Sequence, residues 1–341
     1  MENNLFKRLV YLDHNVLDLM SKGGLMEIQE LISEENWIPV YSNENLNEIR
    51  RSVGYEDSFL EVLDSMSARH IVPNMNDNFQ YIGTATIFEK DPREAFSFFV
   101  DDVKEPPEFG YGLSGMVRKM YGGSSEISFS EIFEHGANEI GDLLDIPDED
   151  IDALDIDLSM KEDIKKMRVS LPGMLKEITM ETGRLLDNEA SDNIVKQQEL
   201  TIGVGPKILK NIKEPNVLLQ VWDKVKETLP DDITTFEEYF GLDQSRWDST
   251  PKRELSVIEK VNGIYHQLNF LGYYRDSKMK KDRRFKASFS DMTHAGMATF
   301  CRLFICRDED LVMKAAAAYE YLGVQTKVVH LKQANKAYQR G

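Results

Sequence analysis

The segment 290–322 restricts the possible folds more than any other part of this sequence. It begins with Asp291 and His294, which share one face if the segment is helical. The four apolar residues at 303–306 are too few for a helix and are typical of a buried strand. The acidic sequence RDED at 307–310 follows, and a helical pattern then resumes. This order predicts an α/β protein with carboxylates at the carboxyl end of a strand, where open α/β sheets bind ligands.

The small residues that follow His294 favour close packing of this helix on a neighbour. They are Ala295, Gly296 and Ala298.

A second acid follows a strand near the beginning of the chain. Residues 8–13, RLVYLD, form a β-branched and aromatic run that ends on Asp13. The next short strand is expected at 37–41, where Pro39 predicts an edge position or a bulge, because proline cannot donate to a strand ladder. Asp13 is therefore expected at the same kind of place as the 307–310 acids, at the end of a strand.

A helix is expected directly after the strand 37–41. Ser42 is a good N-cap, and an apolar stripe at helical spacing follows it. Glu44 and Glu48 lie one turn apart on another face of this helix. Both are candidates for an acidic site.

Together these pieces resemble the PIN-domain family of metal-dependent nucleases. The family begins with a strand that ends in an acid, matched by Asp13. A strand, a hydroxyl residue and a helix with an acid follow, matched best by Glu48. The carboxyl half carries an Asp-x-x-His-like helix start, matched by Asp291 and His294, and an acidic loop, matched by Asp308.

The resemblance implies a PIN-like doubly wound parallel sheet and a metal-dependent endoribonuclease. Asp13, Glu48, Asp291 and Asp308 would hold the metal, with Asp310 as an optional fifth ligand. Oxygen ligands without thiolate suit Mg²⁺ or Mn²⁺ rather than Zn²⁺. Such ions would orient water and stabilise the leaving oxygen during hydrolysis of a phosphodiester. In this family the products carry a 5′-phosphate and a 3′-hydroxyl, and RNA is the commonest substrate.

Several interpretations stay open at this stage. Cys306 stands where the family has a hydroxyl, and a thiol is a poor hydrogen-bonding substitute. Glu44 is a weaker alternative to Glu48. His294 is included among the catalytic residues, as a group that orients a carboxylate or a phosphate, against a role in packing alone. For the whole chain, the alternatives to a ribonuclease are a non-catalytic RNA- or protein-binding module and a structure-specific DNA nuclease.

The PIN-like pattern covers two separate parts of the chain. These parts, 1–83 and 287–341, would form the nuclease core. Residues 84–286 would be a large, mostly α-helical inserted domain of unknown role. A Leu-Pro-Gly sequence at 171–173 separates two helical runs within it.

The charge of the chain is segregated. The net charge of −18 argues against general nucleic-acid binding. However, residues 139–163 hold eleven Asp/Glu and one Lys, a possible surface for a protein partner. Residues 275–286 hold seven Lys/Arg and two Asp, so they form either a solvated linker or a track for phosphates. The expected nucleic-acid-binding residues are Lys278, Lys280, Lys281, Arg283, Arg284, Lys286 and Arg307.

The remaining composition indicates a globular cytoplasmic protein. No apolar run approaches the ~18 residues that a membrane helix needs, and the first residues do not read as a signal peptide. The two cysteines, Cys301 and Cys306, lie five positions apart and cannot form a disulfide framework.

Overall fold

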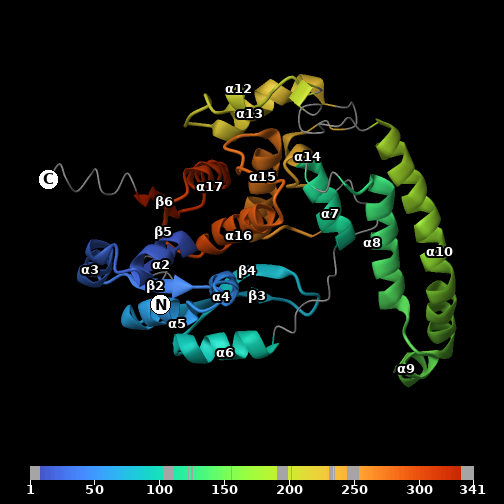
Figure 1. Cartoon of the computed structure of the whole chain (residues 1–341), viewed down its shortest axis with the longest axis horizontal. Helices are drawn as coiled ribbons and strands as arrows, with labels where there is room; N and C mark the ends of the chain where they lie inside the picture. Colours follow the sequence, from blue (N-terminus) through green and yellow to red (C-terminus); the bar gives the residue numbers. More distant parts are fainter. Residues whose placement is uncertain are drawn as a thin grey trace. The chain divides into compact units, whose positions relative to one another are not determined.

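Six strands form one mixed sheet in the order β4-β3-β2-β1-β5-β6. Figure 1 shows the whole chain with its helices and strands. The structure, a computed structural model, describes residues 8–102, 111–121, 123, 126–154, 156–189, 199–200, 202–229, 233, 235–243 and 253–331. The chain divides into two compact units. The first comprises Met1–Lys104, Ile202–Asp276 and Lys286–Gly341, and the second comprises Glu105–Thr201 and Ser277–Phe285.

The strands and most helices belong to the first unit. Its strands are β1 (Leu9–Leu12), β2 (Ile38–Tyr41), β3 (Arg69–Met75), β4 (Tyr81–Phe88), β5 (Leu303–Cys306) and β6 (Lys327–His330). Its helices are α2 (His14–Ser21), α3 (Met26–Glu34), α4 (Asn43–Arg51), α5 (Glu56–Ser65), α6 (Pro92–Asp102), α12 (Pro206–Leu209), α13 (Val217–Val225), η1 (Lys226–Thr228), α14 (Phe236–Tyr239), α15 (Val257–Leu271) and α17 (Glu309–Leu322). Helix α16 (Asp282–Ala298) begins in the second unit and belongs to the first from Lys286 onward.

The alternation of side chains along β1 divides the first unit into two cores. Leu9 and Tyr11 pack with α13, α15, α16 and α17, whereas Val10 and Leu12 pack with α2, α3, α4 and α5. Helices therefore cover both faces of the sheet, which explains why β1 is apolar throughout rather than alternating with polar residues. The α/β class predicted from the sequence is confirmed.

The sheet is mostly but not entirely parallel. Strand β4 pairs antiparallel with β3, while the other neighbours run parallel. The cause is local: a short turn joins β3 to β4, and Asn76 Oδ1 accepts from the backbone N–H groups of Asn78 and Gln80, both at 3.0 Å. A tight hairpin can return the chain only in the antiparallel direction.

Pro39 does not lie on an edge strand. Strand β2 lies inside the sheet, between β1 and β3. The N–H of Ile38 points to β1, where it donates to Arg8 O at 2.7 Å, so the nitrogen of Pro39 faces β3. Pairing with β3 begins only at Val40. Pro39 therefore costs the sheet no hydrogen bond, because its nitrogen faces β3 at a position that precedes the pairing of the two strands.

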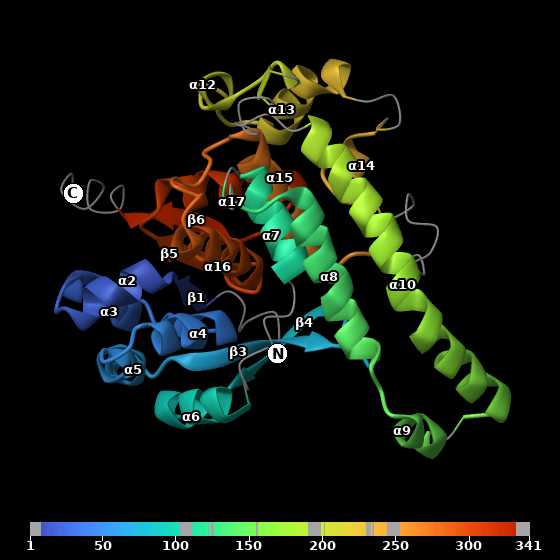
Figure 2. The same ribbon diagram turned by 45° about the vertical axis from the view of Figure 1, so that its right-hand side comes forward.

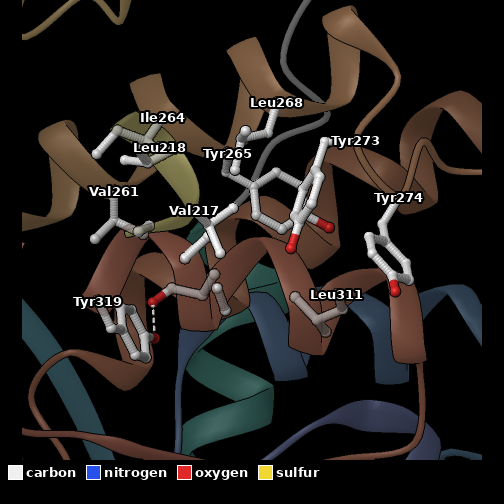
Figure 3. Close-up of a cluster of buried hydrophobic side chains, with 14 of the residues drawn as sticks. Val217, Leu218, Val261, Ile264, Tyr265, Leu268, Tyr273, Tyr274, Leu311 and Tyr319 are labelled. Carbon is white, nitrogen blue, oxygen red and sulfur yellow. Dashed lines mark hydrogen bonds between the residues drawn. The ribbon is translucent and has the colours of Figure 1, made fainter. Parts of the chain in front are cut away.

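The compact units differ from the expected 84–286 insertion. Residues 202–276 belong to the unit that contains the sheet. Figure 3 shows the reason: side chains of α13 and α15 gather over α17. Among them, Leu218, Val261 and Leu268 are at most 1% exposed. The apolar stripes of these helices complete the main core, and β4 adds a further strand from the expected insertion.

The second unit consists of α7 (Tyr111–Met120), α8 (Phe129–Leu144), α9 (Asp148–Ala153) and α10 (Leu158–Glu189). Helices α8 and α10 lie side by side (Figure 2). Asp187, near the end of α10, accepts from the first N–H groups of α8, including that of Phe129 at 2.7 Å. Helix α10 continues through Pro172 rather than ending there.

The acidic segment 139–163 covers the end of α8, α9 and the start of α10. Some of its acids form surface ion pairs, such as Asp148 with Arg168 and Asp152 with Lys165. Its role in binding a partner stays a prediction. Among the described residues, no helix combines the length and the apolar character needed to cross a bilayer.

The predicted close packing around Gly296 is confirmed. A Cβ at this position would lie 2.8 Å from Asn262 Oδ1 and 3.0 Å from Ile258 Cγ2, both on α15. By contrast, a Cβ on Gly173, in the middle of α10, would meet nothing within 4 Å. The two glycines therefore form a matched pair for testing the contact between α15 and α16.

We predict that Gly296→Ala lowers the free energy of unfolding by about 1–2 kcal/mol, because overpacking outweighs the gain in helix propensity. Gly173→Ala should be neutral or stabilising by up to about 1 kcal/mol. Urea denaturation of the full chain measures both. An equally stable Gly296→Ala variant would contradict the close contact.

Candidate active site

Two acids meet where β1 and β5 end side by side. Leu12 pairs with Ile305, and the N–H of Asp13 donates to Ile305 O at 3.0 Å. Asp13 is 1% exposed, and it precedes α2 without capping it through its side chain. Asp308 does cap α17: its Oδ1 accepts from the backbone N–H groups of Asp310 and Leu311. Asp13 Oδ2 accepts from Asn15 Nδ2 at 3.1 Å. The other oxygen of Asp13 and the second oxygen of Asp308 remain for other contacts.

The partly exposed side chain of Glu48 contacts the buried side chain of His294. Glu48 lies on α4, which begins with the expected cap: Ser42 and Asn45 form a reciprocal capping box. His294, on α16, is 0% exposed. Its Nε2 lies 2.8 Å from Glu48 Oε2. Glu44 instead pairs with Arg51 at 2.8 Å. Glu48 rather than Glu44 therefore joins the buried group.

The contact between Glu48 and His294 is an ion pair at neutral pH. Burial alone would lower the pKa of His294, but the charge and hydrogen bond of Glu48 outweigh it and raise the pKa to about 9. Burial likewise would raise the pKa of Glu48, and His294 more than offsets this and lowers it. His294 is thus protonated, with both ring nitrogens as donors.

The protonated ring sets the direction of a buried hydrogen-bond chain. His294 Nδ1 donates to Tyr11 Oη at 2.8 Å, so the Tyr11 hydroxyl is left to donate to Ser42 Oγ at 2.7 Å. Ser42 in turn lies 3.3 Å from Asn45 Oδ1. The chain joins β1, α4 and α16, and it fixes Glu48 in place. Sequence analysis missed Tyr11, since an aromatic residue in a buried strand gives no sign of a polar role.

The other acids repel one another. Burial raises the pKa of Asp13 to about 6, with repulsion from Glu48 and Asp308 adding to it against the attraction of His294. Burial, followed by repulsion from Asp13 and other acids, raises the pKa of Asp291 well above its ordinary value. These interactions place Asp291 within electrostatic reach of both strand-end acids.

Asp291 lies in the middle of α16 and not near a helix start as expected, because residues 282–290 are already helical. It therefore gains nothing from the favourable charge of a helix N-terminus. Asp310 belongs to the same group: burial and then Asp308 raise its pKa to about 6, although Lys314 acts in the opposite direction.

Lys314 is a second internal cation that sequence analysis missed. It is 0% exposed, and its Nζ lies 2.5 Å from Asp276 Oδ1 and 3.1 Å from Asn269 Oδ1. It also lies over the ring of Tyr265, 4.5 Å from the centroid. One signal was present: Lys314 is the sole charged residue in the run LVMKAAAAY.

Cys306 is a buried thiol at the end of β5. Burial, followed by repulsion from Asp13 and Asp308, raises the pKa of Cys306 well above its ordinary value. Its Sγ makes one long contact, 3.9 Å to Asp308 O. The thiol is therefore neutral and a weak hydrogen-bonding group beside the acids.

The carboxylate oxygens of these acids are suitable ligands for a divalent cation, but their positions do not form a complete metal site. In the part of the chain that the structure describes, no three His, Cys, Asp or Glu side chains are grouped so that they could hold a metal. Glu48 already has His294 as its cation, whereas Asp13, Asp291 and Asp308 have no cation in contact within the described residues. Carboxylates that repel one another relax when a cation joins them. These three are therefore the residues that would hold it.

The expected nucleic-acid-binding residues are exposed on their own units. Those at 277–285 belong to the second unit, whereas Lys286 and Arg307 belong to the first. Residues 282–286 form the start of α16 rather than a linker, and Met279 is buried. Their role in binding phosphates stays a prediction.

Comparisons with known proteins leave the family of this chain open. No family model matches it, and neither curated proteins nor solved structures give a match.

The ion pair of Glu48 and His294 predicts a specific pH dependence of stability. The pKa of His294 is about 9 in the folded state and 6.5 ordinarily. Its stabilising effect is therefore complete below about pH 6.5 and is lost as the pH rises through 9. We predict that the wild type loses about 2–3 kcal/mol more stability than Glu48→Gln between pH 6.5 and 9.

Urea denaturation at a series of pH values measures this difference. Glu61→Gln, on the exposed side of α5, is the matched control and should follow the wild type. Parallel profiles for the wild type and Glu48→Gln would mean that His294 is not held as a buried cation.

Proposed function

We propose that this protein is a metal-dependent nuclease with a PIN-like core, acting on RNA. One observation carries the proposal: Asp13 and Asp308 follow two adjacent parallel strands that end side by side. The raised pKa of Asp291, with repulsion from both of these acids among its causes, supports its place in the same group. The chain runs from β1 outward to β2 and β3, and it later returns to add β5 on the other side of β1. The ends of β1 and β5 thus form a topological switch point, where open α/β sheets bind ligands.

The order of the acids along the chain supports the same proposal. The sequence resembles the PIN family in the order of its acids. A strand-end acid comes first, and a helical acid follows the second strand. An acid with His294 then lies on the next core helix, and a final acid follows another strand. The position of Asp291 in mid-helix departs from that pattern. The resemblance therefore supports the proposal through the sheet edge and the acids, rather than through every local detail.

The residues of the candidate site have different roles. Asp13, Asp291 and Asp308 would hold Mg²⁺ or Mn²⁺, which supplies charge for activating water and stabilising the leaving oxygen. His294 neutralises Glu48 and holds it against the site through the 2.8 Å contact. Lys314 neutralises Asp276 at the side of the group. These two internal cations limit the negative charge that a phosphodiester must approach.

One observation favours a second candidate. The described residues contain no ready-made metal-binding group, which suits a non-catalytic binding module with the same fold. The two candidates differ in whether the chain cleaves nucleic acid at all. Cleavage of DNA rather than RNA would distinguish a structure-specific DNA nuclease from a ribonuclease.

We predict that Asp13→Asn and Asp291→Asn each lower cleavage of labelled single-stranded RNA by at least about 100-fold, because each removes a charge that holds the cation. Mn²⁺ or Mg²⁺ should be required, and EDTA should abolish cleavage. The fold should persist, since the amide keeps the shape of the carboxylate and relieves repulsion.

The matched control is Asp64→Asn, an exposed acid on α5 that should cleave like the wild type. Duplex RNA and single-stranded DNA in parallel assays identify the substrate class. Full activity of both site variants, purified alongside the control, would exclude this site as the nuclease centre. A wild type inactive on every substrate would favour the non-catalytic module.

A further inference from the structure

The first unit carries an open hollow of about 520 Å³. Its lining residues come from the start of α4, from β3, and from α6 with the turn before it, and they include Asn43, His70, Lys90, Phe98, Phe99 and Asp101. The volume lies in the range of sites for small molecules or for one chemical group of a polymer. None of these residues belongs to the acidic group described above.

Aromatic rings and a cation face this hollow. Phe98 is 61% exposed, and Phe88 nearby is 39% exposed. Lys90 Nζ lies 4.8 Å from the ring centroid of Phe98 and 5.9 Å from that of Phe88. Exposed aromatic rings and cations are the groups that proteins combine to bind single strands, with bases stacking on the rings and the cations meeting the backbone.

Two further polar residues of the lining, His70 and Asn43, add hydrogen-bonding capacity. His70 Nε2 lies 2.8 Å from Asn43 Oδ1, and the imidazole stacks on Tyr41 with centroids 5.1 Å apart. Burial, and then the charge of Lys90, lower the pKa of His70 to about 4, so the ring is neutral at pH 7. The neutral ring donates from Nε2 to Asn43 Oδ1, which leaves the amide N–H₂ of Asn43 to donate elsewhere.

Asp101 completes this set as an acceptor. Together, an amide donor and a carboxylate acceptor match the edges of nucleobases, whose amino groups and ring nitrogens offer both kinds of partner. A carboxylate beside the hollow would also repel a phosphate placed inside it. The hollow therefore suits the base of a nucleotide, with the phosphate outside and near Lys90.

The hollow and the hydrogen-bonded pair of Glu48 and His294 share helix α4. Asn43 and Glu48 are five residues apart on this helix, a rise of about 7.5 Å. Ser42, next to Asn43, also belongs to the hydrogen-bond chain that ends at His294.

From this geometry we infer that the hollow binds one unpaired base of a single-stranded nucleic acid, with Phe98 as the stacking platform and Lys90 as the contact to the adjacent phosphate. The inference rests on the proposed function and specifies its substrate as single-stranded. Bases in a duplex are paired and stacked, so they cannot enter a hollow of this kind without being unpaired.

Fluorescence anisotropy with a short labelled single-stranded RNA tests the inference in EDTA, where a metal-dependent nuclease cannot cleave. We predict that Phe98→Ala binds about 10-fold more weakly, the size of one lost stacking contact. An oligonucleotide of the same length with abasic positions should bind both proteins equally. Lys90→Ala should flatten the slope of log K against log salt by about 0.7.

Phe79→Ala is the matched control, because Phe79 is 87% exposed on the β3–β4 turn and lies outside the hollow. It should bind like the wild type. Thermal unfolding shows whether each variant is folded. The fluorescence of 2-aminopurine placed in the strand reports stacking directly, because stacking on Phe98 quenches it. Phe98→Ala should remove this quenching.

Equal binding by Phe98→Ala and the wild type would overturn the inference, as would equal weakening of the base-containing and abasic strands. No binding of any single strand would overturn it as well. These outcomes are independent of cleavage: an inactive wild type whose binding still depends on Phe98 would leave the hollow as a base-binding site of a non-catalytic module.

Discussion

The pairing of β1 with β2 on one side and β5 on the other is the constraint on which the rest of this structure depends. Strand β1 has four residues, all buried, and its side chains alternate between the two cores. Strand β5 comes from the far end of the sequence. Once it pairs with β1, Asp308 is placed beside Asp13, and α16 brings Asp291 and His294 to the same edge. The candidate site is therefore a direct consequence of the sheet topology.

Gathering the acids at this edge opposes folding. Raising the pKa of Asp13 from 3.8 to about 6 corresponds to about 3 kcal/mol against the ionised carboxylate in the folded state at neutral pH. His294 and Lys314 offset part of the repulsion by pairing with Glu48 and Asp276. A divalent cation would relieve the remainder. Sites that cost stability when empty are common where function rather than packing selects the residues.

Short-range sequence patterns predicted much of this arrangement. The apolar runs before Asp13 and Asp308 indicated strands, and the ends of parallel strands in one sheet share an edge, so the meeting of these two acids could be expected. Gly296 among small residues indicated a close helix contact. The cap at Ser42 followed from residue type alone. Each of these inferences needed information from only a few neighbouring residues.

The remaining features depend on contacts between distant residues. The apolar stripes of α13 and α15 showed that these helices bury one face, but not that the partner is α17 and the main core. Pro39 indicated an edge because the sequence does not reveal where pairing with β3 begins. Tyr11 and His294 lie 283 positions apart, and Lys314 meets Asp276 only in the fold. Contacts between residues so far apart in the sequence cannot be predicted from the spacing of apolar and polar residues.

The most direct test of the strand-end acids as a metal site is a count of Mn²⁺ bound by the EDTA-treated protein. Electron paramagnetic resonance measures this count in the wild type and in Asp308→Asn. Asparagine caps a helix as well as aspartate does, so this variant keeps the start of α17 and loses the charge. We predict that the wild type binds Mn²⁺ and that Asp308→Asn binds it much more weakly. No binding by the wild type, or equal binding by both proteins, would contradict it.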